Sequence, residues 1–347
     1  MVSQNFMSDN IWGVHPKVMQ ALNDCAQGAD NAYGHDAYTN KLREEMNILF
    51  EKEVTCLPIQ SGTAANGLCL ALCAGPINRV LCHKEAHLWE SECGAIENYT
   101  GGAALEFVAG KNGKVDAKAL DGLLSREDHD FHRQLPSVLS IAQTTEVGTI
   151  YTPNEIKALS AVCKKHGLYL HMDGARLANA AVQYPELSIS ELTWKLGVDV
   201  LSFGFTKNGA MGAEAVIVFD PKLSKTLYFR AKRAGTIASK MRFVSVQILA
   251  MLKDNLWLEL AKDANERAKT VYDGLIGLNM VGKNIPFESN QLFINIDKGL
   301  REKLREQGFE FYNWHSLGGD CCRLICSWET SQASADLLVK TAKELAG

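Results

Sequence analysis

The stretch SFGFTKNGAMGAEAVIVFD, residues 202–220, holds a single lysine, Lys207, among small and apolar residues. Apolar runs at 198–203 and 215–219 flank its glycine-rich middle, which predicts two buried strands joined by a tight loop. A lysine that is desolvated in such a loop has a lowered pKa and a nucleophilic neutral amine. The ordinary alternative is a loop lysine whose ammonium group reaches solvent. The segments around this stretch decide between the two interpretations.

Upstream of this stretch, short apolar segments alternate with helical patterns. Residues 137–142 and 168–173 predict strands, and residues 153–167 predict a helix with a proline near its start and a glycine after its end. A short helix that opens with a capping-box pattern is expected over 188–197. This β–α–β–α–β order predicts an α/β protein with a mostly parallel, mixed sheet between helices. Ligands bind such sheets beyond the carboxyl ends of the strands.

The last third of the chain predicts a second, smaller unit. Its expected elements are a long amphipathic helix at 254–278, a strand at 291–296, a helix near 301–307, a strand at 321–328 and a final helix at 331–345. We therefore expect a large domain at 1–254 and a small C-terminal α/β domain at 255–347. The N-terminal stretch is expected to lie on the large domain or on a partner subunit.

Composition excludes several classes of protein. The 347 residues are 46% hydrophobic and 22% charged, which is typical of a globular chain with a large core. A net charge of −4 favours neither nucleic acid nor an anionic membrane as partner. The ten cysteines lie mostly in apolar runs without zinc-site spacing, so we expect neither disulfides nor a metal site. Without a signal peptide or a membrane span in the sequence, the expected location is cytoplasmic.

Two segments offer groups that suit the ends of one cofactor. In QSGTAAN, residues 60–66, a Ser-Gly-Thr turn at a helix start exposes backbone N–H groups and a hydroxyl that suit a phosphate. In HMDGAR, residues 171–176, Asp173 ends a strand and could keep a pyridine nitrogen protonated, while Arg176 could bind a carboxylate. The ordinary alternatives are a plain helix start, an N-cap aspartate and a surface arginine.

A histidine completes the set. His87, in AHLWESECGA, could be an ordinary histidine or a flat ring that stacks on a flat cofactor. A phosphate turn, a stacking ring, Asp173 and Lys207 are together what pyridoxal phosphate needs: donors for its phosphate, a carboxylate for its ring nitrogen and a lysine for its aldehyde. The combination favours the functional interpretation of Lys207.

These motifs, together with SDNIWGVHPKVMQAL, YGHDAYT, TEVGTIYT and RLICSW, resemble the β-eliminating lyase/threonine aldolase family of fold-type I pyridoxal-phosphate enzymes. The resemblance covers nearly the whole chain and is strongest to the low-specificity L-threonine and L-phenylserine aldolases. It implies cleavage of a β-hydroxy-α-amino acid, such as threonine, allo-threonine or phenylserine, to glycine and an aldehyde. The alternatives are an aminotransferase or β-lyase of the same fold, or a non-catalytic relative that binds the cofactor.

The resemblance also implies roles for individual residues. Lys207 matches the Schiff-base lysine, Asp173 the partner of the pyridine nitrogen and His87 the stacking ring. His132 matches a second histidine near the β-hydroxyl, and the base is His87, His132 or a water. Further residues are expected to bind the cofactor: Ser61, Gly62, Thr63, Arg176, Thr206, Arg233 and Lys240. The substrate is expected to contact Ser8, Tyr33, Arg176 and Arg323.

Relatives of this kind assemble as dimers or tetramers with shared sites, so a homodimer or homotetramer is expected. Four residues are candidates to cross a subunit interface: Tyr33, Arg233, Lys240 and Arg242. The segment RAKRAGTIASKMR, which holds three of them, lacks the glycine run of many relatives.

Overall fold

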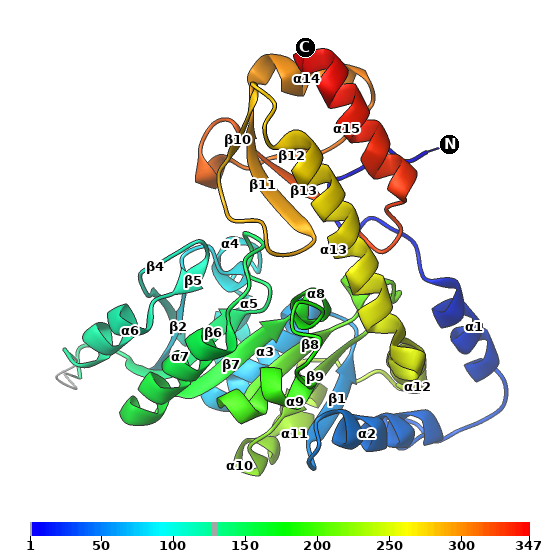
Figure 1. The fold of residues 1–347 in the computed structure, drawn as a ribbon. Coiled ribbons are helices and arrows are strands. Elements are labelled where there is room, and N and C mark those ends of the chain that lie inside the picture. Colours follow the sequence, from blue (N-terminus) through cyan, green and yellow to red (C-terminus); the bar gives the residue numbers. More distant parts are fainter. Residues whose placement is uncertain (1, 127–130) are drawn as a thin grey trace.

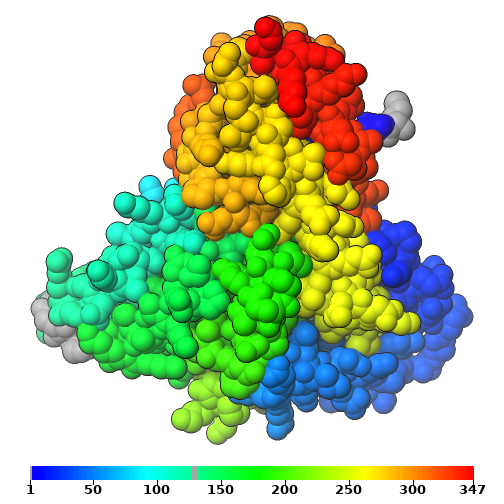
Figure 2. Space-filling view, viewed as in Figure 1, coloured from blue at the N-terminus to red at the C-terminus, as the bar shows by residue number. Residues whose placement is uncertain are grey.

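The computed structural model describes residues 2–126 and 131–347. Two sheets of unequal size are arranged one above the other, and helix α13 (Leu256–Leu275) runs alongside both (Figure 1). In Figure 2 the C-terminal part, coloured orange to red, stands as a lobe above a broader body coloured blue to green. Helix α13, which begins just after the expected division at residue 254, packs against helices of both parts. The division itself stays a prediction.

The large sheet has seven strands in the order β1-β9-β8-β7-β6-β2-β3. Their bounds are β1 Thr55–Ile59, β2 Asn78–Cys82, β3 Ala104–Phe107, β6 Leu135–Ala142, β7 Tyr169–Gly174, β8 Val200–Gly204 and β9 Glu214–Val218. The neighbouring pairs from β3 to β8 are parallel, whereas β9 is antiparallel to both β8 and β1. The predicted α/β class with a mostly parallel, mixed sheet is confirmed.

Helices cover both faces of this sheet. Alternate strand residues enter two different cores: Leu201 and Phe203 pack into one, and Val200 into the other, which contains the buried helix α3 (Gly62–Cys73). The other helices of this part are α1 Pro16–Cys25, α2 Ala37–Leu49, α4 His87–Glu90, α5 Ala95–Thr100, α6 Ala117–Leu124, α7 Pro153–His166, α8 Leu177–Ala181, α9 Ile189–Leu192, α10 Pro221–Ser224, α11 Leu227–Arg233 and α12 Arg242–Leu252. Short 3₁₀ turns lie at η1 Trp194–Leu196, η2 Thr206–Asn208 and η3 Lys253–Asn255, and β4 (Gly110–Lys111) pairs with β5 (Lys114–Val115) as a hairpin.

One predicted helix is divided in two. The capping box at Ser188 and Glu191 is present, as expected. The helix that it opens ends at Leu192, because Thr193 adopts φ −130° and ψ −101°, and only the 3₁₀ turn η1 follows. The continuous helix expected over 188–197 is therefore wrong.

The small sheet is antiparallel, with the order β10-β11-β13-β12. Its elements are β10 Val281–Lys283, β11 Gln291–Ile296, α14 Lys298–Glu306, β12 Tyr312–Asn313, η4 His315–Leu317, β13 Cys321–Ile325 and α15 Gln332–Ala346. Phe6 is fully buried in the core of this sheet, donates its N–H to Glu310 O (2.8 Å) and accepts from Ile325 N (2.9 Å). The expectation that the N-terminal stretch lies on the large domain is thus wrong around Phe6.

Within the described parts of the chain, none of the helices combines the length and the apolar character that a membrane crossing requires.

Candidate active site

Lys207 lies in a tight loop directly after β8, as the sequence predicts. Phe205 N donates to Ala213 O (3.2 Å), which closes the loop, and Asn208 Nδ2 donates to Trp257 O (2.7 Å), which fixes it to α13. Gly209 ends the 3₁₀ turn at φ +111°, a conformation that favours glycine. The loop therefore presents Lys207 from a rigid support at the carboxyl end of β8.

Asp173 lies on the neighbouring strand, near the carboxyl end of β7. Its buried carboxylate accepts from Asn66 Nδ2 (2.8 Å) and from Ala175 N (3.0 Å). Burial raises the pKa of Asp173, but the charges of His87 and Lys207 and the two hydrogen bonds outweigh burial, so the pKa is lowered. Asp173 is therefore held as a carboxylate close to Lys207.

A chain of polar groups connects Asp173 to His87. Asn66, on α3, also donates to Glu92 Oε1 (2.8 Å), and this oxygen lies 2.7 Å from His87 Nδ1. Burial lowers the pKa of His87, but the hydrogen bond to Glu92 and the charges of Glu146 and Asp173 outweigh burial and raise it. Glu92, which Asn66 holds, therefore fixes the orientation of the half-buried His87 ring. His87 belongs to the same site as Asp173, since Asn66 also binds the Asp173 carboxylate.

The start of α3 supplies the predicted phosphate turn. Ser61 is the N-cap, with its hydroxyl accepting from Ala64 N (3.4 Å). Apart from its chain neighbours and the backbone of its own helix, no atom of residues 2–126 and 131–347 lies within 4 Å of the position that a Cβ of Gly62 would occupy, so the turn is open beside the helix start. Thr63 is half-buried in the first turn. Backbone N–H groups at a helix start bind anions without further side chains.

The hydroxyl of Thr206 is engaged by the lysine loop itself. It donates to Ala213 O (3.4 Å) and accepts from Ala213 N (3.1 Å). These bonds tie the two ends of the loop together, so Thr206 holds the loop that carries Lys207.

Arg176 is paired with a residue that sequence reasoning missed. Its Nε and Nη2 donate to Asp9 Oδ2 (2.7 Å) and Oδ1 (2.9 Å), and both side chains are buried. Asn290 Nδ2, next to the small sheet, also donates to Asp9 Oδ2 (3.3 Å). The neighbouring Ser8 is buried and accepts from Asn10 N (3.1 Å) through its hydroxyl. The guanidinium group of Arg176 is thus fixed from one side by the N-terminal segment.

Arg323, on β13, presents a second guanidinium group. It donates through Nη2 to Met7 O (3.2 Å) and lies over the rings of Trp314 (4.6 Å) and Tyr312 (5.0 Å). Its Nε is buried and has no hydrogen-bond partner among the residues that the structure describes. Burial and the charge of Arg176 lower the pKa of Arg323. This buried donor is free to bind an acceptor from a ligand.

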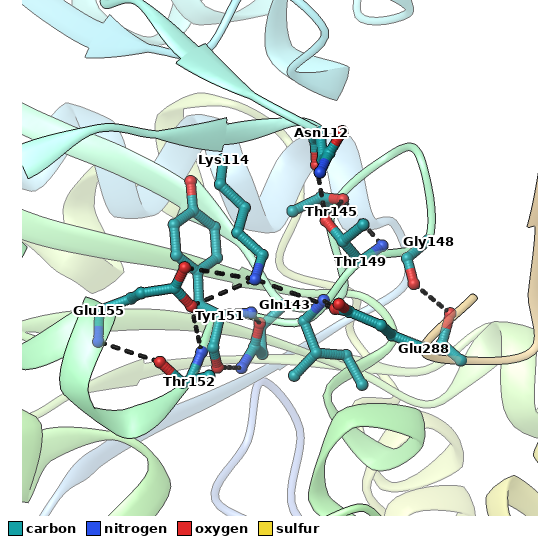
Figure 3. A network of polar contacts seen from close by, with 12 residues as sticks. Asn112, Lys114, Gln143, Thr145, Gly148, Thr149, Tyr151, Thr152, Glu155 and Glu288 are labelled. Atoms are coloured by element: carbon teal, nitrogen blue, oxygen red, sulfur yellow. Dashed lines mark hydrogen bonds and ion pairs between the residues drawn. The ribbon is translucent and has the colours of Figure 1, made fainter. Parts of the chain in front are cut away.

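The segment after β6 connects the large sheet to the small one. Gln143 N donates to Asp173 O (2.7 Å), so the segment starts beside the site. Figure 3 shows Lys114 between the carboxylates of Glu155 (3.1 Å) and Glu288 (3.9 Å). Glu288 Oε2 accepts from Ile150 N (2.6 Å). These contacts fix the small sheet above the strand ends that carry the candidate site.

Comparison with known proteins agrees with this geometry. Residues 5–298 match the family model described as Beta-eliminating lyase. The chain belongs to this family. It is 39% identical over 332 residues, 95% of this chain and 94% of the relative, to a low specificity L-threonine aldolase from a Pseudomonas species. The structure is similar to that of Leishmania major threonine aldolase, with a TM-score of 0.92, 29% identity and coverage of 99% of this chain and 100% of that one.

More distant members show the same fold. A structure from Exiguobacterium, described as a putative aromatic amino acid beta-eliminating lyase/threonine aldolase, matches with a TM-score of 0.76 at 18% identity, covering 99% of this chain and 97% of that one. The fold-type I class and the family predicted from the sequence are both confirmed.

The remaining predicted residues lie on the surface, except for Arg242, which is half-buried. His132 is exposed just ahead of β6, with its ring 4.2 Å from that of Phe131. Tyr33 is half exposed, at 50%, and lies under Lys232 Nζ (4.4 Å from the ring centre). Arg233 and Lys240 are exposed as well, and Arg242 stacks on Phe243. Among the residues that the structure describes, Tyr33, Arg233 and Lys240 form no hydrogen bond or ion pair with Lys207 or Asp173.

Three partners of the site, Asp9, Asn66 and Glu92, were not predicted. Each stands inside a motif that the family resemblance uses: SDNIWG, SGTAAN and AHLWESECGA. The sequence signal was therefore present, but it gave no indication of which side chain each residue contacts.

Proposed function

We propose that this chain is a pyridoxal-phosphate-dependent aldolase that cleaves L-threonine, L-allo-threonine or a related β-hydroxy-α-amino acid to glycine and an aldehyde. The observation that carries the proposal is that Asp173 and Lys207 lie at the ends of the neighbouring strands β7 and β8, where their charges interact. Arg176, at the start of α8, and Arg323, on β13, add two guanidinium groups whose charges interact with each other. The 39% identity to a low specificity L-threonine aldolase supports the same reaction.

The donor set fits pyridoxal phosphate. The open turn at Gly62 and the start of α3 offer backbone N–H groups for a phosphate. Asp173 is a buried carboxylate with a lowered pKa, which suits a protonated pyridine nitrogen. Asn66 Oδ1 and Glu92 Oε2 are buried without partners in the described chain, which leaves polar capacity beside Asp173. Lys207 would bind the aldehyde carbon, and His87 would lie against the ring.

Pyridoxal phosphate supplies a ring that accepts negative charge from the α-carbon of a bound amino acid. When the cofactor is bound, Asp173 would keep the ring nitrogen protonated, because its carboxylate is buried and fixed by Asn66 and Ala175. Glu92 and Asn66 orient the ring of His87. The protein thus contributes fixed charges and a fixed orientation at this end of the site.

Two guanidinium groups would bind the substrate carboxylate. Arg323 has a buried Nε without a partner in the described chain, and Arg176 is held by Asp9 through Nε and Nη2, which leaves its Nη1 edge for a ligand. A carboxylate held at two points has a fixed orientation, which selects the bond to be cleaved. Ser8, next to Asp9, is the proposed third contact.

A base must remove the proton from the β-hydroxyl oxygen. Glu92 engages His87 Nδ1, so Nε2 is the nitrogen through which His87 would accept this proton when the ring is neutral. His132 is the alternative, and its exposed position requires the segment ahead of β6 to lie against the substrate.

We also propose a homodimer or homotetramer in which Tyr33, Arg233, Lys240 and Arg242 complete the site of a partner subunit. The exposed positions of Tyr33, Arg233 and Lys240 support this assignment. The cytoplasmic location and the involvement of Tyr33 with substrate stay predictions.

The test is a product assay. Purified protein with pyridoxal phosphate should release an aldehyde and glycine in equal amounts from threonine, allo-threonine or phenylserine without an added 2-oxo acid. Lys207→Ala, the control, should release neither product and should lose the visible absorption of the bound cofactor. Turnover that requires a 2-oxo acid and yields no aldehyde would overturn the proposal in favour of an aminotransferase. Cofactor binding without turnover of any amino acid would favour a non-catalytic relative.

A further inference from the structure

Glu214 is a buried carboxyl group that the reaction described above does not use. It is the first residue of β9, opposite Gly204 of β8 and Ile59 of β1. Only 7% of the residue is exposed. A buried carboxyl group is costly unless it is paired or protonated, so its presence among apolar strands requires an explanation.

The strand register directs Glu214 to the same side of the sheet as Asp173. Asp173 is opposite Ser202, and Gly204 of the same strand is opposite Glu214. Residues that are opposite each other, or two apart on one strand, project from the same face. Asp173 and Glu214 therefore lie on one face, with the strand that leads to Lys207 between them.

Gly204 creates the space that the carboxyl group occupies. A Cβ at this position would lie 2.8 Å from Glu214 Oε2 and 2.7 Å from Ala175 Cα. Glu214 Oε2 is therefore packed tightly against the end of β8, three residues before Lys207. The backbone φ of Gly204 is one that any residue can adopt. A glycine is therefore needed here because Glu214 and Ala175 lie too close for a side chain, and not because of the backbone conformation.

The groups that face Glu214 come from two other elements. Thr206 donates hydrogen bonds to the carboxyl group, and Lys207 contributes a positive charge from the same loop, while Asp173 contributes a negative charge from β7. Burial raises the pKa of Glu214, and the negative charge of Asp173 raises it further. The hydrogen bonds of Thr206 and the charge of Lys207 lower it, and the result is a pKa of about 7. Glu214 is thus a buried acid with a raised pKa, packed against the strand end that leads to Lys207.

We propose that Glu214 is the internal proton acceptor for Lys207. This inference rests on the proposed function, in which the Lys207 amine must bond to the cofactor aldehyde and be released again when an amino acid binds. Lys207 and Glu214 form no direct hydrogen bond or ion pair among the described residues, so the proposed transfer runs through one water molecule. In the forward direction the Lys207 ammonium group gives a proton to this water while the water gives one to a carboxylate oxygen of Glu214, leaving a neutral amine and a neutral acid. The reverse transfer gives an ammonium–carboxylate pair when the lysine is free. No other bond is made or broken in this step.

The experiment follows the visible absorption that appears when cofactor-free protein is mixed with pyridoxal phosphate, from about pH 6 to about pH 9. The variant is Glu214→Gln, which keeps the size of the side chain and removes the proton acceptor. The control is Asp199→Asn, at the opposite end of β8, where a partly buried carboxylate accepts from Leu170 N (2.8 Å). Far-UV circular dichroism checks that each protein is folded.

We expect the band to form about a hundredfold more slowly in Glu214→Gln at neutral pH, because the ammonium group must release its proton to water. The defect should shrink as pH rises, while Asp199→Asn and the wild type share one profile. An unchanged rate and pH profile in Glu214→Gln would overturn the inference. If that variant does not fold, Glu214→Asp replaces it, and a wild-type profile with the shortened acid would equally overturn the inference. A wild-type protein that forms no band would refute the proposed function itself.

Discussion

Asp9 and Arg176 are 167 residues apart in the chain and form a buried, two-point ion pair. Burial raises the pKa of Asp9, but the charge and hydrogen bonds of Arg176 outweigh burial and lower it. The pair joins the N-terminal segment to the start of α8, and Asn290 adds a contact from the small sheet. One side chain therefore ties three separate parts of the chain to the proposed carboxylate site.

Removing the charge of Asp9 should destabilise the fold. Asp9→Asn leaves the guanidinium group of Arg176 buried without a counter-charge, which costs about 3–5 kcal/mol of unfolding free energy. Urea unfolding of the cofactor-free protein measures this loss. Asp121→Asn removes one partner of an exposed pair with Lys165 and is the control, which should be close to wild type. Equal stability of the two variants would contradict the structural role of Asp9.

Asn66 should be required for the position of Asp173. Asn66→Leu removes both donors of the amide, which leaves Asp173 Oδ2 without a donor, while Glu92 Oε1 keeps its contact with His87. A buried acceptor that loses its donor costs about 1–3 kcal/mol, so the melting temperature of the cofactor-free protein should fall clearly. Binding of pyridoxal phosphate should weaken as well, because the carboxylate is no longer fixed. A variant that melts and binds cofactor as the wild type does would show that Asn66 is dispensable.

Glu92 should control the protonation of His87. Burial alone lowers the pKa of His87, so Glu92→Gln should lower this pKa by removing the carboxylate at Nδ1. NMR of the imidazole resonances across pH measures the shift. A raised histidine pKa adds stability below the unfolded value, which is lost as pH rises through the folded value. The variant should therefore lose more stability in mild acid than at high pH, and an unchanged His87 titration would contradict this account.

Arg323 should act on substrate and not on cofactor. Arg323→Leu removes the guanidinium group whose Nε has no partner among the described residues, and the affinity for glycine should fall about tenfold or more. The spectrum of the bound cofactor should persist. Arg305→Leu is the matched control, since Arg305 also stacks on a ring, Phe311 at 5.1 Å, but lies on α14. If glycine binds both variants equally well, Arg323 has only a structural role.

The sequence predicts what depends on local pattern. Lys207 and Asp173 follow apolar runs whose period identifies strands, so their position at strand ends could be expected without a structure. Asp9 and Asn66 could not be found in this way, because their partners Arg176 and Asp173 are 167 and 107 residues away. Phe6 and Met7 are the two apolar residues of the polar segment 3–10, and this pattern does not indicate which of the two sheets buries Phe6.

The same limit applies to Glu214. Nothing in the segment GAEAVIVFD distinguishes a buried glutamate from one that ends a strand in solvent. Only the register opposite Gly204 gives the carboxyl group a buried place beside the lysine loop. A buried acid of this kind has a thermodynamic consequence that does not depend on the reaction.

Glu214→Gln should change how stability depends on pH. The folded-state pKa of about 7 is above 4.5, the ordinary pKa of a glutamate, so between these values the unfolded chain has released a proton that the folded chain still binds. The wild-type protein therefore loses stability as pH rises from about 4.5 to about 7, by up to roughly 1.4 kcal/mol for each pH unit. The glutamine variant does not titrate, so relative to wild type it should be more stable near pH 8 than near pH 5. Urea unfolding of cofactor-free protein at both pH values measures the difference, and Glu44→Gln, at an exposed position of α2, should show none. Parallel pH profiles for Glu214→Gln and wild type would mean that Glu214 ionises without cost in the folded protein.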